Sequence, residues 1–264
     1  MSKAICLCIF LWFGLVPQIL CAADISAVIS DLEGGDHLLV SKAGQEKRSA
    51  KLGERVFSGE LIEVPNDVSA RLLFANGIQI FLAENVRFKV AAELIEKKEV
   101  PLLDLIYGKI RVLFTEKNDQ AEIRFLINAP AVVAGVRGTD FVVDVDDEVS
   151  EVHTLEGVVE VGLDRPGFLS GAVDSLKEGR YVSQRRGLRK LAAIQDFNRA
   201  EFLKRLGEKH PRLAKLHDRR EQTREKMKEK KEKIKKNTRE RRRDQNVRER
   251  VKDRVIKRRP PPGK

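Results

Sequence analysis

Short runs of alternating apolar and polar residues follow one another between residues 24 and 184, and turn-forming residues separate them. Such alternation is typical of half-buried β-strands, and closely spaced short strands are typical of an all-β protein. We therefore expect strands at residues 25–32, 37–42, 69–74, 78–82, 102–106, 109–114, 122–127, 141–145, 151–154 and 158–161. The pattern fits a sandwich and a solenoid-like stack equally well.

Turn residues support several of these strands. Asn76-Gly77 lies between two of them, and an Asn-Gly pair is the strongest short signal for a β-hairpin. Residues 34–36 and 146–148 are further polar turns, and Gly108 separates the strand expected at 102–106 from the one expected at 109–114.

After about residue 185 the apolar residues recur at helical spacing. They predict an amphipathic helical segment over residues 185–215, with one face packed on the β domain and with Gly207 and Pro211 ending or bending it. The apolar positions are Leu188, Leu191, Ile194, Phe197, Phe202, Leu203 and Leu206. In residues 216–264 acidic residues stand four positions before basic ones, as in Glu229 and Lys233, which favours a solvated basic helical tail.

Charge divides the chain into two opposite parts. Of 51 Lys and Arg and 40 Asp and Glu, residues 185–264 hold 32 and 12, which leaves 19 and 28 for residues 1–184. The β region is therefore net −9 and the C-terminal part net +20, so the latter should attract anionic surfaces. The residues expected to make this contact are Lys226, Lys228, Lys230, Lys231, Lys235, Lys236, Arg241, Arg242 and Arg243.

The most distinctive motif is the signature segment, residues 129–141, a run of small and β-branched residues with Arg137 and Asp140 as its only charges. Pro130 lacks a backbone donor, so it should open a strand or lie at a sheet edge. Gly135 and Gly138 indicate a bulge or a close approach of two backbones. We expect these glycines to hold a geometry that a Cβ atom would obstruct.

The signature segment resembles that of the FecR-like domain, an all-β periplasmic module of iron-responsive anti-sigma regulators and other exported proteins. Residues 53–62, 71–77, 152–161 and 176–183 resemble the other motifs of that family, so the resemblance covers about residues 26–184. It implies a twisted, solenoid-like domain over residues 24–184 with a short final strand near 176–183. Its motif residues here are Pro130, Gly135, Val136, Arg137, Gly138, Thr139 and Phe141.

Residues 1–23 have the features of a signal peptide. Lys3 is followed by an apolar run, and Cys21-Ala22-Ala23 offers small residues for cleavage, so the mature chain should begin at Asp24 and be periplasmic. The alternative is an uncleaved membrane anchor, since about 20 apolar residues can span a bilayer. All cysteines, Cys6, Cys8 and Cys21, lie in this segment, so the mature protein should hold no thiol site.

No pattern of catalytic or metal-binding residues is present. His37, His153, His210 and His217 lack metal-binding spacing, and the acidic turn around Asp146 lacks the glycine and distal glutamate of a calcium loop. No nucleophile elbow or phosphate-binding glycine loop occurs. We therefore expect no enzyme activity, no metal and no cofactor.

The family resemblance raises one chemical alternative. Some members of its anti-sigma branch cleave themselves at a Gly-Thr bond in this motif, where this chain has Gly138-Thr139. Thr139 Oγ1 would attack the Gly138 carbonyl, and water would hydrolyse the resulting ester. We favour a structural role, because in that branch a cytoplasmic anti-sigma domain and a transmembrane helix precede the FecR-like region, whereas residues 1–23 here resemble a signal peptide.

Two classes of function stay open. In the first, an exported, non-enzymatic scaffold or signalling-related module contacts a protein or glycan through its β domain and an anionic surface through its basic tail. In the second, the tail binds nucleic acid. The second is disfavoured by export and by the lack of aromatic residues after Phe202 to stack on bases.

Overall fold

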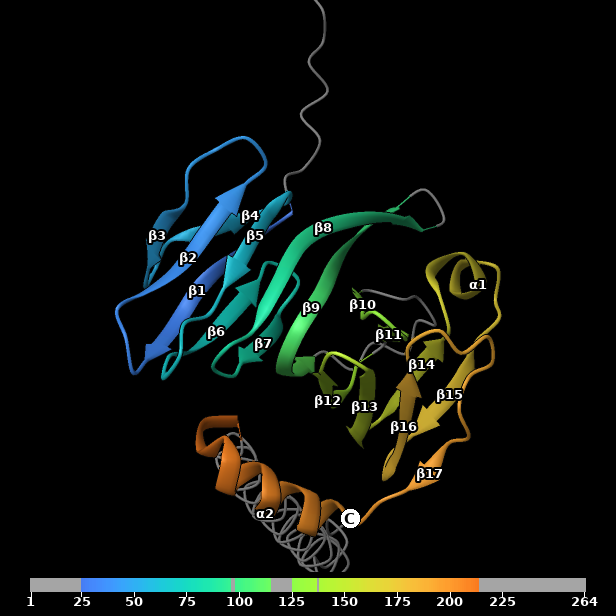
Figure 1. Cartoon of the computed structure of the whole chain (residues 1–264). Coiled ribbons are helices and arrows are strands. Elements are labelled where there is room, and N and C mark those ends of the chain that lie inside the picture. The colour runs from blue at the N-terminus through green and yellow to red at the C-terminus, as the bar shows by residue number, and fades with distance from the viewer. Residues whose placement is uncertain (1–24, 96–97, 115–124, 137, 214–264) are drawn as a thin grey trace, which may run out of the picture.

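The computed structural model describes residues 25–95, 98–114, 125–136 and 138–213. In these residues, 17 strands form one continuous mixed sheet, and helices are few and short. The all-β class expected from the alternation is confirmed (Figure 1). The signal-peptide and basic-tail segments, residues 1–23 and 216–264, lie outside the described residues.

The sheet is folded into two layers that share a single long strand, β9 (Lys98–Phe114). In layer A the order is β4 (Arg55–Phe57), β1 (Ser26–Glu33), β6 (Ser69–Phe74), β7 (Ile78–Leu82), β9, β12 (Asp140–Val145), β13 (Val149–Glu156), β16 (Arg180–Arg185) and β17 (Gln195–Asp196). In layer B it is β3 (Arg48–Lys51), β2 (His37–Lys42), β5 (Glu60–Glu63), β8 (Arg87–Ile95), β9, β10 (Phe125–Asn128), β11 (Val133–Val136), β14 (Val158–Gly162) and β15 (Asp174–Lys177).

Strand β9 corrects the expectation of separate strands at 102–106 and 109–114. The chain passes through Gly108 without leaving the sheet: before it β9 pairs with β8 and β10, and after it with β7 and β12. Gly108 has φ +98°, and a Cβ atom there would lie 2.9 Å from Val86 Cα. Glycine therefore marks the place where one strand changes layer, because only a residue without a side chain fits this backbone.

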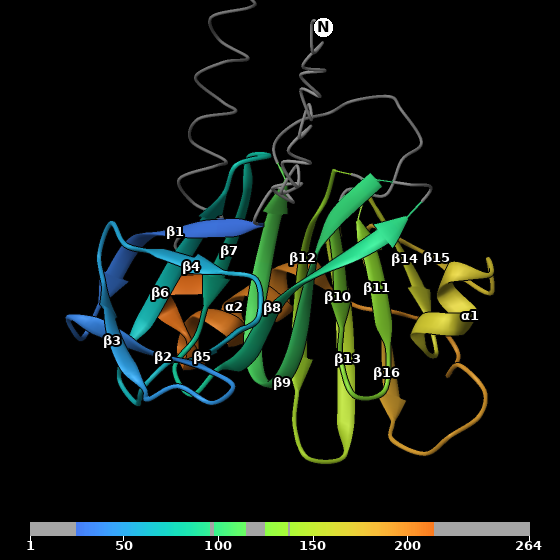
Figure 2. The same ribbon diagram turned by 90° about the horizontal axis from the view of Figure 1, so that it is seen from above.

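The shared strand also divides the fold along the sequence. Strands β1–β8 lie on one side of β9 in both layers and strands β10–β17 lie on the other side (Figure 2). Apart from the parallel pairing of β10 with β9, the ladders are antiparallel. The core lies between the layers and includes Ile29, Ile80, Phe88, Phe125 and Val143.

Several strands match the sequence expectations and others do not. β2, β6 and β7 have the predicted bounds, and the Asn76-Gly77 turn joins the last two. The single strand expected near 176–183 is two strands, β15 and β16, separated by a turn at Gly179.

The expected helical segment over residues 185–215 is mostly not helical. Helix α2 covers only Arg199–Lys209, capped by Asn198, whose side chain accepts from the backbone N–H of Glu201. Before it the chain is extended and contributes β17, and Gly207 lies within the helix instead of ending it. The predicted packing is confirmed for Leu191, Ile194, Phe197, Phe202, Leu203 and Leu206, which contact the core. It is wrong for Leu188, which is 54% exposed.

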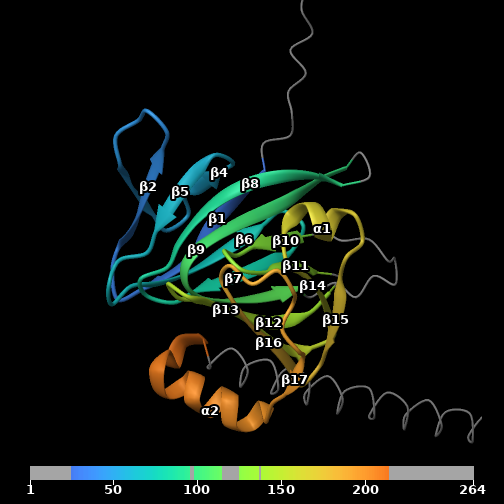
Figure 3. The same ribbon diagram turned by 45° about the vertical axis from the view of Figure 1, so that its right-hand side comes forward.

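Two short helices cover opposite outer faces of the sheet. Helix α1 (Arg165–Leu169) places Phe168 on layer B, against Leu102, Leu126 and Val133. Helix α2 lies across layer A, below β12, β13 and β16 in Figure 3. No helix among the described residues is both long and apolar enough to span a membrane.

Candidate functional site

The signature segment joins the two layers. Pro130 lies in the turn between β10 and β11, where the Ala129 N–H donates to the Val132 carbonyl over 2.9 Å. Gly135 and Val136 belong to β11 in layer B, and Phe141 belongs to β12 in layer A. Gly138 and Thr139 lie in the connection between the layers, and Arg137 lies outside the described residues.

Gly135 faces an aromatic ring. A Cβ atom at this position would lie 2.4 Å from Phe168 Cζ, so the ring of Phe168 rests directly on the glycine backbone. The predicted close approach is therefore real at Gly135, but it is made by a side chain of α1 and not by a second backbone. The sequence does not reveal this partner because Phe168 lies on a different element, more than thirty residues away.

Gly138 shows the expected backbone geometry. Its φ is +104°, and the ladder between β12 and β13 shifts register just after it, between Asp140 and Phe141. A Cβ atom on Gly157 would lie 3.0 Å from the Gly138 carbonyl oxygen, so two backbones do meet here. Thr139 follows with 3% of its surface exposed, and its hydroxyl has no hydrogen-bond partner among the described residues.

Asp140, the last charge of the signature segment, forms a buried ion pair with Arg111 of β9. Arg111 donates from Nε to Asp140 Oδ1 over 2.8 Å and from Nη2 to Oδ2 over 2.7 Å, and both side chains are 1% exposed. Arg111 Nη1 donates over 2.7 Å to the carbonyl of Leu213. The guanidinium group of Arg111 thus links Asp140 of the signature segment to the main chain at Leu213.

We call residues 197–213 the strap, because they cross the outer face of layer A. Near its start the strap packs on His153 of β13. The imidazole lies between Tyr181 and Phe202, with ring centroids 4.8 and 4.4 Å away, and meets the ring of Phe197 edge-on. Leu206 and Leu213 of the strap are buried. Aromatic stacking and apolar burial therefore fix both halves of the strap.

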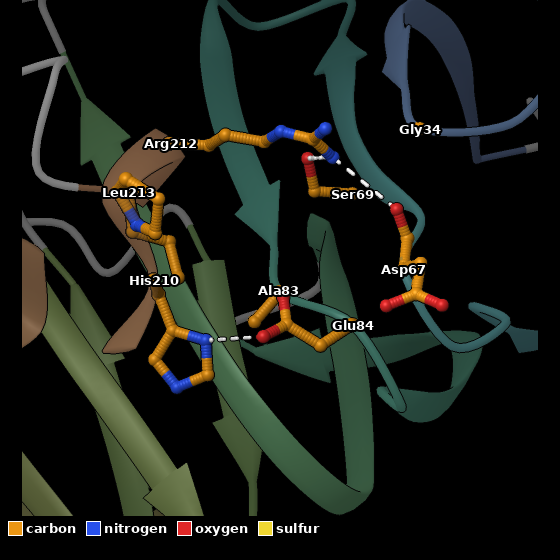
Figure 4. A pocket seen from close by; sticks show the side chains of 9 residues that line it. Gly34, Asp67, Ser69, Ala83, Glu84, His210, Arg212 and Leu213 are labelled. Carbon is orange, nitrogen blue, oxygen red and sulfur yellow. Dashed lines mark hydrogen bonds and ion pairs between the residues drawn. The ribbon is translucent and has the colours of Figure 1, made fainter. Parts of the chain in front are cut away.

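Ion pairs fasten the strap to the β domain. Arg199 Nη1 lies 3.1 Å from Glu178 Oε1, and His210 Nδ1 lies 3.0 Å from Glu84 Oε1. Arg212 Nε lies 2.8 Å from Glu33 Oε2, and its Nη1 donates to Ser69 Oγ over 2.9 Å. A cavity of about 410 Å³ opens between residues 210–213 of the strap and the loops at Asp67 and Glu84 (Figure 4).

Layer A presents one continuous row of side chains toward the strap. The strand registers align Phe81, Arg111, Val142, His153, Tyr181 and Gln195 across β7, β9, β12, β13, β16 and β17. His153 Nε2 lies 3.0 Å from Glu151 Oε2, and this hydrogen bond, with a smaller contribution from Ser183, lowers the pKa of Glu151 despite its partial burial. The row holds a buried cation and an aromatic slot at His153, and the carboxylate of Glu151 lies beside it.

The remaining sequence candidates lie apart from this row or outside the described part. His37 pairs with the neighbouring Asp36, and His217 is not described. The acidic turn is a hairpin in which Asp146 Oδ1 accepts from two backbone N–H groups, those of Glu148 and Val149. Within the described ranges no three His, Cys, Asp or Glu side chains gather as a metal site would require.

All the tail residues expected to bind an anionic surface lie outside the described residues, so their contact stays a prediction. Sequence reasoning missed Arg111 altogether. Its signal was an arginine inside the apolar run of β9, which needs a buried anion, but the identity of that anion depends on how the strands pair.

Comparison with known proteins gives a family match and two structural matches. Residues 60–160 match the family described as FecR protein. Two crystal structures of a putative anti-sigma factor from Parabacteroides distasonis, at 2.50 and 1.65 Å resolution, are 16% identical with TM-scores of 0.42 and 0.41. Each alignment covers 54% of this chain and 62% of that chain, so this chain spans less than two thirds of their length. No curated protein matches the sequence.

Proposed function

From the FecR domain that residues 60–160 of this chain carry, we propose that the protein is an exported, non-enzymatic binding or scaffold module in signalling. Its β domain contacts a protein or glycan in the periplasm. Its basic tail, residues 216–264, contacts an anionic surface such as phospholipid head groups. The family match supports a regulatory module, and the charge of the tail supports the anionic partner.

The single observation that carries this proposal is the anchor at Leu213. Its carbonyl is held by Arg111, which is itself fixed by Asp140 of the signature segment. The strap also pairs Arg199 and Arg212 with Glu178 and Glu33 of the acidic domain, and His210 contacts Glu84. These carboxylates of the domain are thus already engaged by the strap, which favours an external anionic partner for the basic tail.

Electrostatics sets the size of the effect. Each Lys or Arg close to an anionic bilayer contributes on the order of 1 kcal/mol, so a handful of contacts gives a useful affinity. The attraction decays over roughly 10 Å at 0.1 M salt and over roughly 3 Å at 1 M. Binding by the tail should therefore be strong at low salt and be lost at high salt.

Sedimentation with vesicles tests this proposal. We expect anionic vesicles to retain the full-length protein at low salt and to release it near 1 M salt, whereas neutral vesicles retain none. A chain truncated after Leu213 should stay in solution. The truncation keeps the strap, because removing it would expose Arg111 and His153 of layer A.

A matched variant separates the tail from truncation effects. Replacing the nine predicted contact residues, from Lys226 to Arg243, by glutamine keeps the chain length and should abolish retention. If the full-length protein binds anionic vesicles no better than the truncated chain, the tail has no such partner and the proposal is wrong.

Self-cleavage at Gly138-Thr139 is a second candidate, favoured by the unpartnered, buried hydroxyl of Thr139 next to a glycine with φ +104°. Attack of Oγ1 on the Gly138 carbonyl carbon would form an ester and free the Thr139 amine, and water would then release the two fragments. We expect the purified chain to remain intact. Intact-mass measurement over several days, beside a Thr139→Ala control, checks this. Two fragments that appear only in the wild type, with masses that sum to the whole chain plus one water, would establish cleavage.

A further inference from the structure

The outer face of layer A beneath the strap combines features that a peptide-binding surface needs. It offers an aromatic slot at His153, whose imidazole stacks on Tyr181 and receives the ring of Phe202, together with a rim of carboxylates and a buried guanidinium that donates to a main-chain carbonyl. We propose that this face is a binding surface for a cationic, aromatic-bearing helix of a partner protein, and that the strap is its intramolecular occupant. This deepens the proposed function by naming the chemistry of the protein that the β domain contacts.

The ion pairs between strap and domain all have the same sense. Arg199 and Arg212 supply the positive partner from the strap, and the domain supplies the carboxylates of Glu178 and Glu33. His210 adds a hydrogen-bonding contact to a third carboxylate of the domain, that of Glu84. A surface with this pattern selects cationic helices and repels acidic ones.

The aromatic slot supplies the specific contact. Phe202 stacks on His153 with an interplanar angle of 25°, and Phe197 meets the same imidazole at 89°. Phe197 and Phe202 also touch each other edge-on at 5.2 Å. Such aromatic contacts stabilise a complex beyond the area that they bury, so a helix without this pair should bind much more weakly.

Arg111 binds a main-chain carbonyl, so its contact does not depend on the side chains of the bound segment. It donates to the carbonyl of Leu213, and any peptide of the same backbone path offers a carbonyl there. Because Asp140 holds the guanidinium by two hydrogen bonds, the donor stays in place when the strap leaves. The donor is therefore available to any segment that follows the same backbone path.

The strap can leave the face without unfolding the sheet. Helix α2 has 11 residues, shorter than the roughly 12–15 that make an isolated helix even marginal, so it depends on this contact. Its bridging ion pairs are partly exposed, and such pairs contribute little each. The strand ladders of both layers are complete without it, which allows the strap to open locally.

A peptide of residues 194–213, added to the full chain, tests the proposal. In wild-type protein the strap competes with the peptide, so its apparent affinity is reduced by the small fraction of open molecules. In the variant Phe202→Ala with Arg212→Glu, the strap is weakened while the peptide keeps both residues. We expect the peptide to bind this variant about tenfold more tightly than the wild type, measured by fluorescence anisotropy of a labelled peptide.

Two controls are matched to these changes. Lys204→Glu reverses a charge on the exposed side of the strap and should leave peptide affinity at the wild-type level. A peptide with Phe197 and Phe202 replaced by alanine keeps every charge and should bind the opened variant at least tenfold more weakly. Hydrogen exchange should show faster exchange of strap amides in the variant, with the amides of β12 unchanged.

Three results would overturn the proposal. The first is that the peptide binds the wild type and the variant with equal affinity. The second is that the peptide without phenylalanines binds the variant as tightly as the original peptide does. The third is that the amides of the strap and of β12 exchange at the same rate. The last would make the strap an inseparable part of the domain. These readouts use no vesicles and no tail residues, so failure here is distinct from failure of the tail to bind an anionic surface.

Discussion

Replacing Asp140 by alanine should lower the free energy of unfolding by about 3–5 kcal/mol, because it leaves a buried arginine without its anion. Arg111 is 1% exposed, and without Asp140 it would keep its hydrogen bond to the neutral Leu213 carbonyl. The loss should loosen the strap as well as the β9–β12 pairing. Urea denaturation followed by circular dichroism measures the change.

The same two strands contain a matched control. Asp144 pairs with Lys109 over 2.8 Å, but the Asp144 side chain is 37% exposed. Asp144→Ala should therefore cost at most about 1 kcal/mol, as exposed ion pairs do. Equal losses for the two substitutions would contradict the special role that we give to the buried pair.

Replacing Gly135 by valine should destabilise the domain by about 1–3 kcal/mol, since the new side chain would overlap the ring of Phe168. The backbone of Gly135 is ordinary extended strand, so valine would be acceptable there without the ring. Thermal and urea unfolding of the variant measure the loss. The prediction is specific to one contact, between β11 and α1.

A double-mutant cycle tests that specificity. In a Phe168→Ala background the ring is gone, so Gly135→Val should cost little more than Phe168→Ala alone. Gly138→Val should behave differently, because its cost of about 1–3 kcal/mol comes from φ +104° and no side-chain removal relieves it. If both glycine variants melt like the wild type, the structural reason for the signature segment is wrong.

Sequence patterns predicted the parts of the fold that depend on neighbours in the chain. Strands β2, β6 and β7 have alternation and turns within a few residues, and their bounds were predicted correctly. The continuation of β9 through Gly108 depends on the close approach of Val86, which is distant in the sequence. The sequence does not show this contact, so Gly108 was predicted to separate two strands. Residues 188–197 were predicted to be helical from apolar residues spaced by three. The same spacing also occurs in an extended segment that packs on a core, so it did not distinguish the two.

Only part of the candidate site could be predicted from the sequence, because the rest depends on contacts between residues that are distant in the chain. The signature segment was recognisable from its glycines and from its resemblance to a family, and the FecR match confirms that resemblance. The use of Asp140 was not recognisable, because its partner Arg111 is brought to it by the pairing of β9 with β12. Polar side chains that fasten distant segments carry no local periodicity, so only the strand registers reveal them.

The division of the fold at β9 has a consequence for how the chain folds. Every described ladder joins strands up to β9 with one another, or strands from β9 onward with one another, so the strand pairing within each half is fairly local in sequence. The two halves share β9 and one core, in which Phe74 of the first half meets Phe125 of the second edge-on. The strap also returns across the boundary, from β13 to Glu33, Ser69 and Glu84 of the first half. During synthesis from the N-terminus the ladders of the first half can therefore form before those of the second, and the strap, which is made after both, docks last.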